Sequence, residues 1–147
     1  MARSRKSPAE KYIDNVIRGK VVACRWVRLF CERHKRDLKT GRKRGIYFDR
    51  DAAQHAIEFY QFLHHSKGKW AGKTIYLEPW QQAIVWVLFG WQRRKTRTRR
   101  FRSGYVEIAR KNGKTTMASG LALYMMLADG EAGAEVYSAA TKRDQAK

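Results

Sequence analysis

Apolar residues recur at helical spacing through the N-terminal half of the chain. Between Pro8 and Gly41 the spacing predicts one long amphipathic helix that ends before Gly41. Its apolar face would consist of Ile13, Val16, Ile17, Val21, Cys24, Val27 and Cys31. Asp49 is the expected N-cap of a second helix, and Pro79 the expected start of a third, mostly buried helix that reaches about Gly90.

The pattern changes after the third helix. Tyr105 to Ala109 mixes β-branched, aromatic and small residues, as a short buried strand does. Residues 117 to 128 return to helical spacing, and Asp129-Gly130 ends that run with turn chemistry. Ala134 to Ala139 is a second strand candidate. A strand, helix, strand order predicts a parallel, right-handed unit.

These elements predict an α/β fold in which N-terminal helices precede an incomplete parallel sheet of the P-loop NTPase type. Residues 1–72 would form a basic helical segment, and residues 73–147 the N-terminal part of the nucleotide-binding domain. The side chains expected to pack near the sheet are Trp80, Ile84, Val87 and Leu88.

The turn between the first strand candidate and its helix has the chemistry of a phosphate-binding loop. Gly113-Lys114-Thr115 matches the second half of G-x-x-x-x-G-K-[ST], in which the lysine reaches the β/γ phosphates and the hydroxyl binds Mg²⁺. The first half does not match, because Ile108 stands where the first glycine belongs. The alternative is a Gly-Lys-Thr that merely starts a helix, but the flanking elements favour the phosphate loop.

Net charge sets the class of partner. The 147 residues contain 32 Lys and Arg against 13 Asp and Glu, a formal charge of +19, which predicts salt-dependent attraction to nucleic acid. The densest basic run is Arg93 to Arg102; it suits phosphate contact, although such runs are often only solvated loops. No apolar segment approaches the roughly 20 residues that span a bilayer, and no signal peptide is visible, so we expect no membrane partner and a cytoplasmic location.

Cysteine and histidine carry no recognisable chemistry in this sequence. In one helix, Cys24 and Cys31 would lie two turns apart, about 10 Å along the axis, which is too far for a disulfide. With His34 they make a poor zinc signature, because a fourth ligand is missing.

Seven short segments, in order along the chain, resemble the large terminase subunit of tailed bacteriophages. They are Trp70–Lys73, Leu77–Gln81, Phe89–Trp91, Arg99–Arg102, Ala109–Thr115, Ala128–Glu131 and Ala140–Ala146. The resemblance is collinear from roughly Tyr47 to Lys147, and the N-terminal helix is similar to the leading helical segment of that family.

The resemblance implies an ATP-driven motor that moves viral DNA into a capsid, with ATP and Mg²⁺ as cofactors. Gln81 would contact adenine, Lys114 and Thr115 the phosphates and Mg²⁺, and Arg110 would stabilise the transferring γ-phosphoryl group. The loop would be completed by Lys111, Asn112, Gly113 and Thr116. Thr141 and Gln145 would couple nucleotide to DNA, and Arg97, Arg99 and Arg100 would contact DNA.

The resemblance also implies partners: double-stranded viral DNA, the small terminase subunit and the portal, in the bacterial host cytoplasm. Such motors need an acidic pair on a later strand, and Asp129 and Glu131 are poor substitutes because they would lie roughly 20 Å from the loop. We therefore expect either a fragment or a chain completed by a second polypeptide, with little or no ATP hydrolysis alone. The alternatives are a stand-alone basic DNA-binding or interaction module derived from a terminase, and an unfolded remnant.

Overall fold

The computed structural model describes residues 6–66, 68–131 and 133–139. The chain divides into two compact units, Met1–Ile108 and Ala109–Lys147, and each is described by itself. The sequence-based division at residue 72 stays a prediction.

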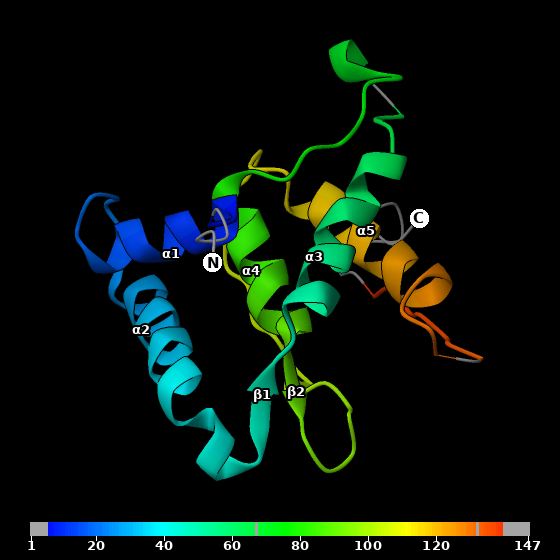
Figure 1. Ribbon diagram of the computed structural model, residues 1–147. Helices are drawn as coiled ribbons and strands as arrows, with labels where there is room; N and C mark the ends of the chain where they lie inside the picture. The colour runs from blue at the N-terminus through cyan, green and yellow to red at the C-terminus, as the bar shows by residue number, and fades with distance from the viewer. Residues whose placement is uncertain (1–5, 67, 132, 140–147) are drawn as a thin grey trace. The chain divides into compact units, whose positions relative to one another are not determined.

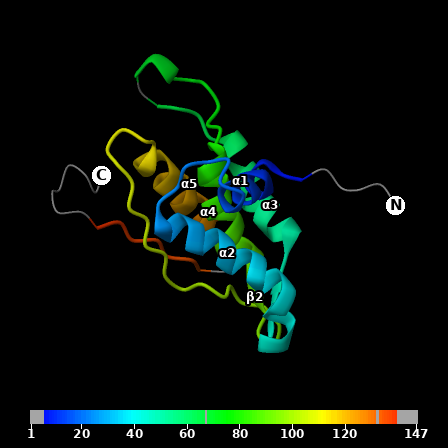
Figure 2. The same cartoon turned by 90° about the vertical axis from the view of Figure 1, so that its left-hand side faces the viewer.

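The described residues of the first unit form four α-helices, with α4 (Pro79–Gly90) at their centre (Figure 1). Both α1 (Pro8–Ile17) and α3 (Arg50–Glu58) pack against α4, and α2 (Arg25–Thr40) packs against α1. From α1, α2 runs toward the end of the unit where the strands lie (Figure 2). Three short 3-10 turns complete the unit: η1 (Gly41–Arg44), η2 (Phe59–Phe62) and η3 (Gly68–Trp70).

The predicted long N-terminal helix is wrong, because the chain breaks between α1 and α2. Gly19 has φ of 70°, a left-handed conformation that glycine adopts without steric cost, and it ends α1 just after Arg18. The second helix then begins after Cys24, which is exposed, whereas Cys31 is buried within α2. The two cysteines therefore do not share one helix face.

The predicted parallel sheet is absent from the described residues. The sheet they form has two antiparallel strands, β1 (Ile46–Phe48) and β2 (Trp91–Arg93), with Tyr47 opposite Gln92. Residues 105–109 and 134–139 are not strands, and Tyr105 and Tyr137 are exposed. Strand propensity alone does not hold such segments in place, because a strand is stabilised by hydrogen bonds to a partner and by packing of one face.

The predicted helices from Asp49 and Pro79 are confirmed. The Asp49 side chain accepts a hydrogen bond from the Ala52 N–H at 3.0 Å, and Pro79 is the first residue of α4. Of the four core residues predicted on α4, Val87 is buried, while Trp80, Ile84 and Leu88 are half-buried.

Aromatic side chains fill the core where the strands meet the helices. The rings of Phe48, Trp86, Trp91 and His34 contact one another at centroid distances of 5.0 to 5.9 Å. Gly90 makes room for this cluster, since a Cβ there would lie 2.4 Å from the Phe48 ring. Trp91, 1% exposed, anchors β2 in the cluster.

The second unit contains α5 (Lys114–Leu127), which confirms the helix predicted after the phosphate loop. Its buried residues Met117, Gly120 and Tyr124 recur at helical spacing, as the sequence pattern indicates. The helix ends at Leu127, where the Ala128 N–H donates to the Tyr124 carbonyl.

Candidate nucleotide-binding loop and basic surfaces

The loop before α5 turns through two residues with left-handed backbone. Lys111 has φ of 67° and Gly113 φ of 68°, so the chain reverses sharply within three residues. The side-chain amide of Asn112 donates to the carbonyls of Ala109 and Arg110, both at 3.3 Å. Asn112 therefore stabilises the turn that precedes the helix.

Gly113 is the N-cap of α5, and its carbonyl accepts the Met117 N–H at 2.9 Å. The N–H groups of the first helical turn have no acceptor within the helix, and the helix dipole makes this end positive. Lys114 and Thr115 are exposed and Thr116 is half-buried. This arrangement suits an anionic oxygen such as that of a phosphate.

Cations concentrate beside the same helix end. Arg110, Lys111 and Lys114 are all exposed, so a phosphate at the N-terminus of α5 would meet charged side chains from both the loop and the helix. The residues present therefore fit the phosphates of a nucleotide.

For Mg²⁺ the same loop offers hydroxyl groups, of which that of Thr115 is the predicted ligand. No group of three or more His, Cys, Asp or Glu side chains in the described part of the chain could hold a metal ion. Mg²⁺ is commonly bound through substrate phosphates and water with one or two protein ligands, so the hydroxyl fits as a ligand that acts together with the phosphates.

Gln81 has a local structural role in the first unit. It is 6% exposed, and its Oε1 accepts a hydrogen bond from the Glu78 N–H at 2.9 Å. The side chain thus closes the start of α4 in the manner of a capping box. An adenine contact through Gln81 Oε1 would have to share or break this hydrogen bond.

The basic run Arg93 to Arg102 separates into residues with different surroundings. Arg97 is exposed in the loop after β2, where its φ of 56° is left-handed. The Arg99 guanidinium lies over the Phe89 ring at 5.1 Å. Arg100 is held inside the fold, because its guanidinium forms an ion pair with Asp37 at 2.5 Å.

Asp37 is the buried acidic centre of the first unit. Its side chain is 1% exposed and is paired with both Arg100 and Arg44. Burial by itself would raise the pKa of this carboxyl, but the hydrogen bonds and charges of the two arginines outweigh burial and lower it. Asp37 therefore stays ionised and joins α2 to η1 and to the basic run.

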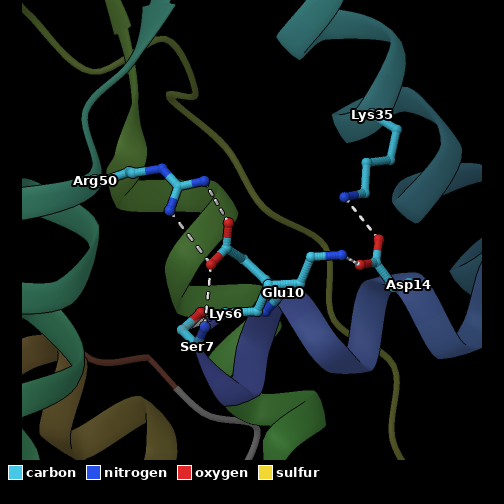
Figure 3. A network of polar contacts seen from close by, with 6 residues as sticks. All are labelled: Lys6, Ser7, Glu10, Asp14, Lys35 and Arg50. Atoms are coloured by element: carbon cyan, nitrogen blue, oxygen red, sulfur yellow. Dashed lines mark hydrogen bonds and ion pairs between the residues drawn. The ribbon is translucent and has the colours of Figure 1, made fainter. Parts of the chain in front are cut away.

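Two further carboxylates connect α1 to its neighbours (Figure 3). Glu10 accepts from the Ser7 N–H and forms an ion pair with Arg50 of α3 at 2.6 Å. Asp14 pairs with Lys6 at 2.6 Å and with Lys35 of α2 at 2.7 Å. Sequence reasoning missed these pairs, although the Ser7-Pro-Ala-Glu10 spacing is a capping-box signature visible in the sequence.

His34 has a structural hydrogen bond rather than a metal-binding role. Its Nδ1 accepts the Trp91 indole N–H at 3.0 Å, so the ring is neutral with its hydrogen on Nε2. Burial lowers the pKa of His34 to about 4 and raises the pKa of the Cys31 thiol to about 11. Both groups are therefore uncharged at neutral pH.

Thr141 and Gln145, predicted to couple nucleotide to DNA, lie outside the described residues. Gln81 belongs to the first compact unit, and the loop residues Arg110 to Thr116 belong to the second. Within the second unit, the loop residues are brought together at one helix end.

In the described part of the chain, no helix combines the length and apolar character needed to cross a membrane.

Comparison with models of known protein families gives a match for the second half of the chain. Residues 79–147 match the model of the terminase large subunit, ATPase domain. No curated protein and no solved structure matches the chain significantly. The matched segment includes α4, the basic run, the loop and α5. Residues 79–147 thus belong to the ATPase-domain family of the terminase large subunit.

Proposed function

We propose that this chain is the N-terminal ATP-binding portion of a DNA-packaging terminase large subunit, which powers ATP-driven translocation of viral DNA into the capsid. The observation that carries the proposal is the family match over residues 79–147, because it includes a turn whose glycine, lysine and threonine open a helix. Residues 73–147 would form the nucleotide-binding part, and residues 1–72 a basic helical segment.

The loop residues have distinct roles in this proposal. The backbone N–H groups of Gly113 to Thr116, at the positive N-terminal end of α5, hold the phosphates. The Lys114 ammonium group neutralises the charge of the β and γ phosphate oxygens. Arg110 and Lys111 are exposed in the same loop. The positive guanidinium of Arg110 stabilises the negative charge of the γ-phosphoryl group. Asn112 keeps the turn in shape through its two hydrogen bonds.

Magnesium supplies charge neutralisation of the β and γ oxygens when it is bound with ATP. On the protein side, the Thr115 hydroxyl is the proposed ligand. Gln81 is the proposed adenine contact, because a glutamine side chain can pair with the N6 and N7 edge of adenine.

Double-stranded DNA is the proposed polyanionic partner, together with the remainder of the terminase, the small terminase subunit and the portal. Arg97 and Arg99 are the proposed DNA contacts of the basic run. Arg100 would contribute by fixing that run to Asp37, since its guanidinium is already engaged there.

The test is equilibrium binding of a fluorescent ATP analogue with Mg²⁺ to the purified chain and to Lys114→Ala. We expect at least a tenfold loss of affinity, which corresponds to about 1.4 kcal/mol. The matched control is Lys95→Ala, which removes the same charge from the loop after β2 and should leave the affinity unchanged. Equal affinity of the wild type and Lys114→Ala would contradict the proposal.

A stand-alone basic DNA-binding module is the second candidate. It is favoured by the formal charge of +19 and by the lack of a parallel sheet in the described residues. This candidate predicts DNA affinity that does not change with ATP or with Lys114→Ala, whereas nucleotide binding would be absent.

A further inference from the structure

An open cavity of about 620 Å³ lies in the first unit, beside the strands. Its walls come from the end of α2, η1, β1, β2 and the loop that follows β2. That volume lies within the range of about 300–1,000 Å³ that is usual for small-molecule sites. The cavity is therefore large enough for one nucleotide unit.

Three arginines from two segments give the cavity its charge. Arg42 comes from η1, and Arg94 and Arg97 come from the loop after β2. All three side chains are exposed, and no carboxylate in the described residues lies within ion-pair distance of any of them. The carboxylate in the wall, Asp37, is already paired with Arg44 and Arg100. The cavity thus presents unpaired guanidinium groups, which suit phosphate oxygens.

Aromatic rings form another part of the wall. Tyr47, Phe48 and Trp91 line the cavity, and the Tyr47 hydroxyl donates to Gln92 Oε1 at 2.8 Å, which fixes the ring. Phe48 and Trp91 are held in the core by their mutual contact. Tyr47 is half-buried and comes from β1, so it is the ring best placed to meet a base.

The backbone of Arg97 is a further sign that this residue is held for its side chain. Its φ of 56° is one that an arginine adopts at a steric cost, and its N–H donates to the Arg93 carbonyl at 2.8 Å. Glycine would take this conformation without strain, so the turn does not itself require an arginine.

We propose that this cavity binds one unpaired nucleotide of a single-stranded nucleic acid, with its phosphate on Arg42, Arg94 and Arg97 and its base on Tyr47. Unpaired bases expose the π-face that an aromatic side chain stacks on, whereas bases in a duplex are stacked on each other. An aromatic ring in the wall of the site therefore favours a single strand over a duplex. None of its lining residues belongs to the phosphate loop, so we expect binding here that does not depend on ATP.

The test is fluorescence anisotropy of a labelled oligothymidine with the full chain as salt is raised. The triple variant Arg42→Ala, Arg94→Ala, Arg97→Ala should bind at least tenfold more weakly, and its slope of log affinity against log salt should fall by about 0.7, as expected for the loss of one phosphate contact. The matched control removes the same charge from α1 and the following turn, through Lys11→Ala, Arg18→Ala and Lys20→Ala. Equal losses in the two triple variants would overturn the proposal, because charge alone would then explain binding.

The base contact is tested separately. Tyr47→Leu should weaken binding of oligothymidine about tenfold, while Tyr47→Phe should keep it, and an abasic strand should bind the wild type and Tyr47→Leu alike. Circular dichroism melts show whether each variant is folded. An abasic strand that binds as tightly as oligothymidine, a duplex that depends equally on Arg42 and Arg94, or a free mononucleotide that competes equally well would each overturn the proposal. Lys114→Ala should leave oligothymidine binding unchanged, which separates this site from the phosphate loop.

Discussion

The buried Asp37 carboxylate has two arginine partners that differ in exposure. The side chain of Arg100 is 19% exposed and that of Arg44 is 48% exposed. Removing a buried partner leaves a charge without compensation, whereas water can replace a partner at the surface. The two arginines should therefore contribute unequally to stability.

We predict that Arg100→Ala lowers the free energy of unfolding by about 3 kcal/mol and Arg44→Ala by about 1 kcal/mol or less. Urea denaturation of the two variants measures both values. Equal losses would contradict the burial argument, and so would an Arg100→Ala variant as stable as the wild type.

Two indole groups in the core differ in hydrogen bonding. The Trp91 N–H donates to His34 Nδ1, whereas the buried Trp86 N–H has no acceptor among the described residues. Trp91→Phe and Trp86→Phe remove the same atoms, but only the first breaks a hydrogen bond. We predict that Trp91→Phe costs about 1 kcal/mol more in unfolding free energy, as urea denaturation would show. A larger loss in Trp86→Phe would refute this difference.

His34 should make stability depend on pH. Its pKa is lowered by burial from 6.5 to about 4, so the unfolded chain binds a proton in this interval and the folded chain does not. Stability from this group is therefore complete above pH 6.5 and is lost as pH falls toward 4. His34→Gln keeps an acceptor for Trp91 but cannot titrate, so its melting temperature should fall less between these pH values. Parallel pH profiles for the wild type and His34→Gln would count against the assignment.

At the scale of elements, glycines near the ends of two helices meet different requirements. A Cβ at Gly90 would lie 2.4 Å from Phe48 and 3.0 Å from the Ala53 side chain, whereas Gly19 has nothing within 4 Å. Gly19 instead has φ of 70°, so a substitution there meets only backbone strain. Close packing at α4 and conformation at α1 are thus separate requirements.

We predict that Gly90→Ala lowers the unfolding free energy by about 2–3 kcal/mol through overpacking, and Gly19→Ala by about 1 kcal/mol through its left-handed backbone. Thermal melts followed by circular dichroism would compare the two. If Gly19→Ala were the more damaging substitution, the account of these helix ends would be wrong.

The sequence predicted the helices whose signals are local. Asp49 and Pro79 begin helices as expected, and the helix after Gly113 is present. The sequence analysis missed the break at Gly19 for two reasons. The apolar spacing continues across this residue, and many helices tolerate an internal glycine. The two strands that do form, β1 and β2, are short, and their pairing brings together residues far apart in sequence. No local pattern reports such a pairing.

The candidate loop could be predicted from Gly113, Lys114 and Thr115, because that motif is local and its helix is apparent from spacing. The ion pairs of Asp37 with Arg44 and Arg100 could not, since they depend on how α2 meets the basic run. The cavity arginines also come from separate segments. The sequence identifies the basic run from Arg93 to Arg102. It does not show which of these residues pair inside the fold, as Arg100 does, and which are exposed, as Arg97 is.

At the scale of the whole molecule, the high net positive charge goes together with acidic side chains that are paired inside the fold. The formal charge is +19, and Glu10, Asp14 and Asp37 are all paired with basic side chains of other segments in the first unit. These carboxylates hold helices together, while many arginines and lysines stay exposed. A protein of this balance attracts polyanions, with an affinity that falls as salt rises.

The central claim is that residues 110–116 bind the phosphates of ATP. The most direct measurement is the backbone amide NMR spectrum of the isotope-labelled chain during titration with Mg·ATP. We predict that the largest shifts occur at Gly113, Lys114, Thr115 and Thr116, and that Lys114→Ala reduces them. Shifts confined to Arg42, Arg94 and Arg97, or no shifts from a folded chain, would contradict the claim.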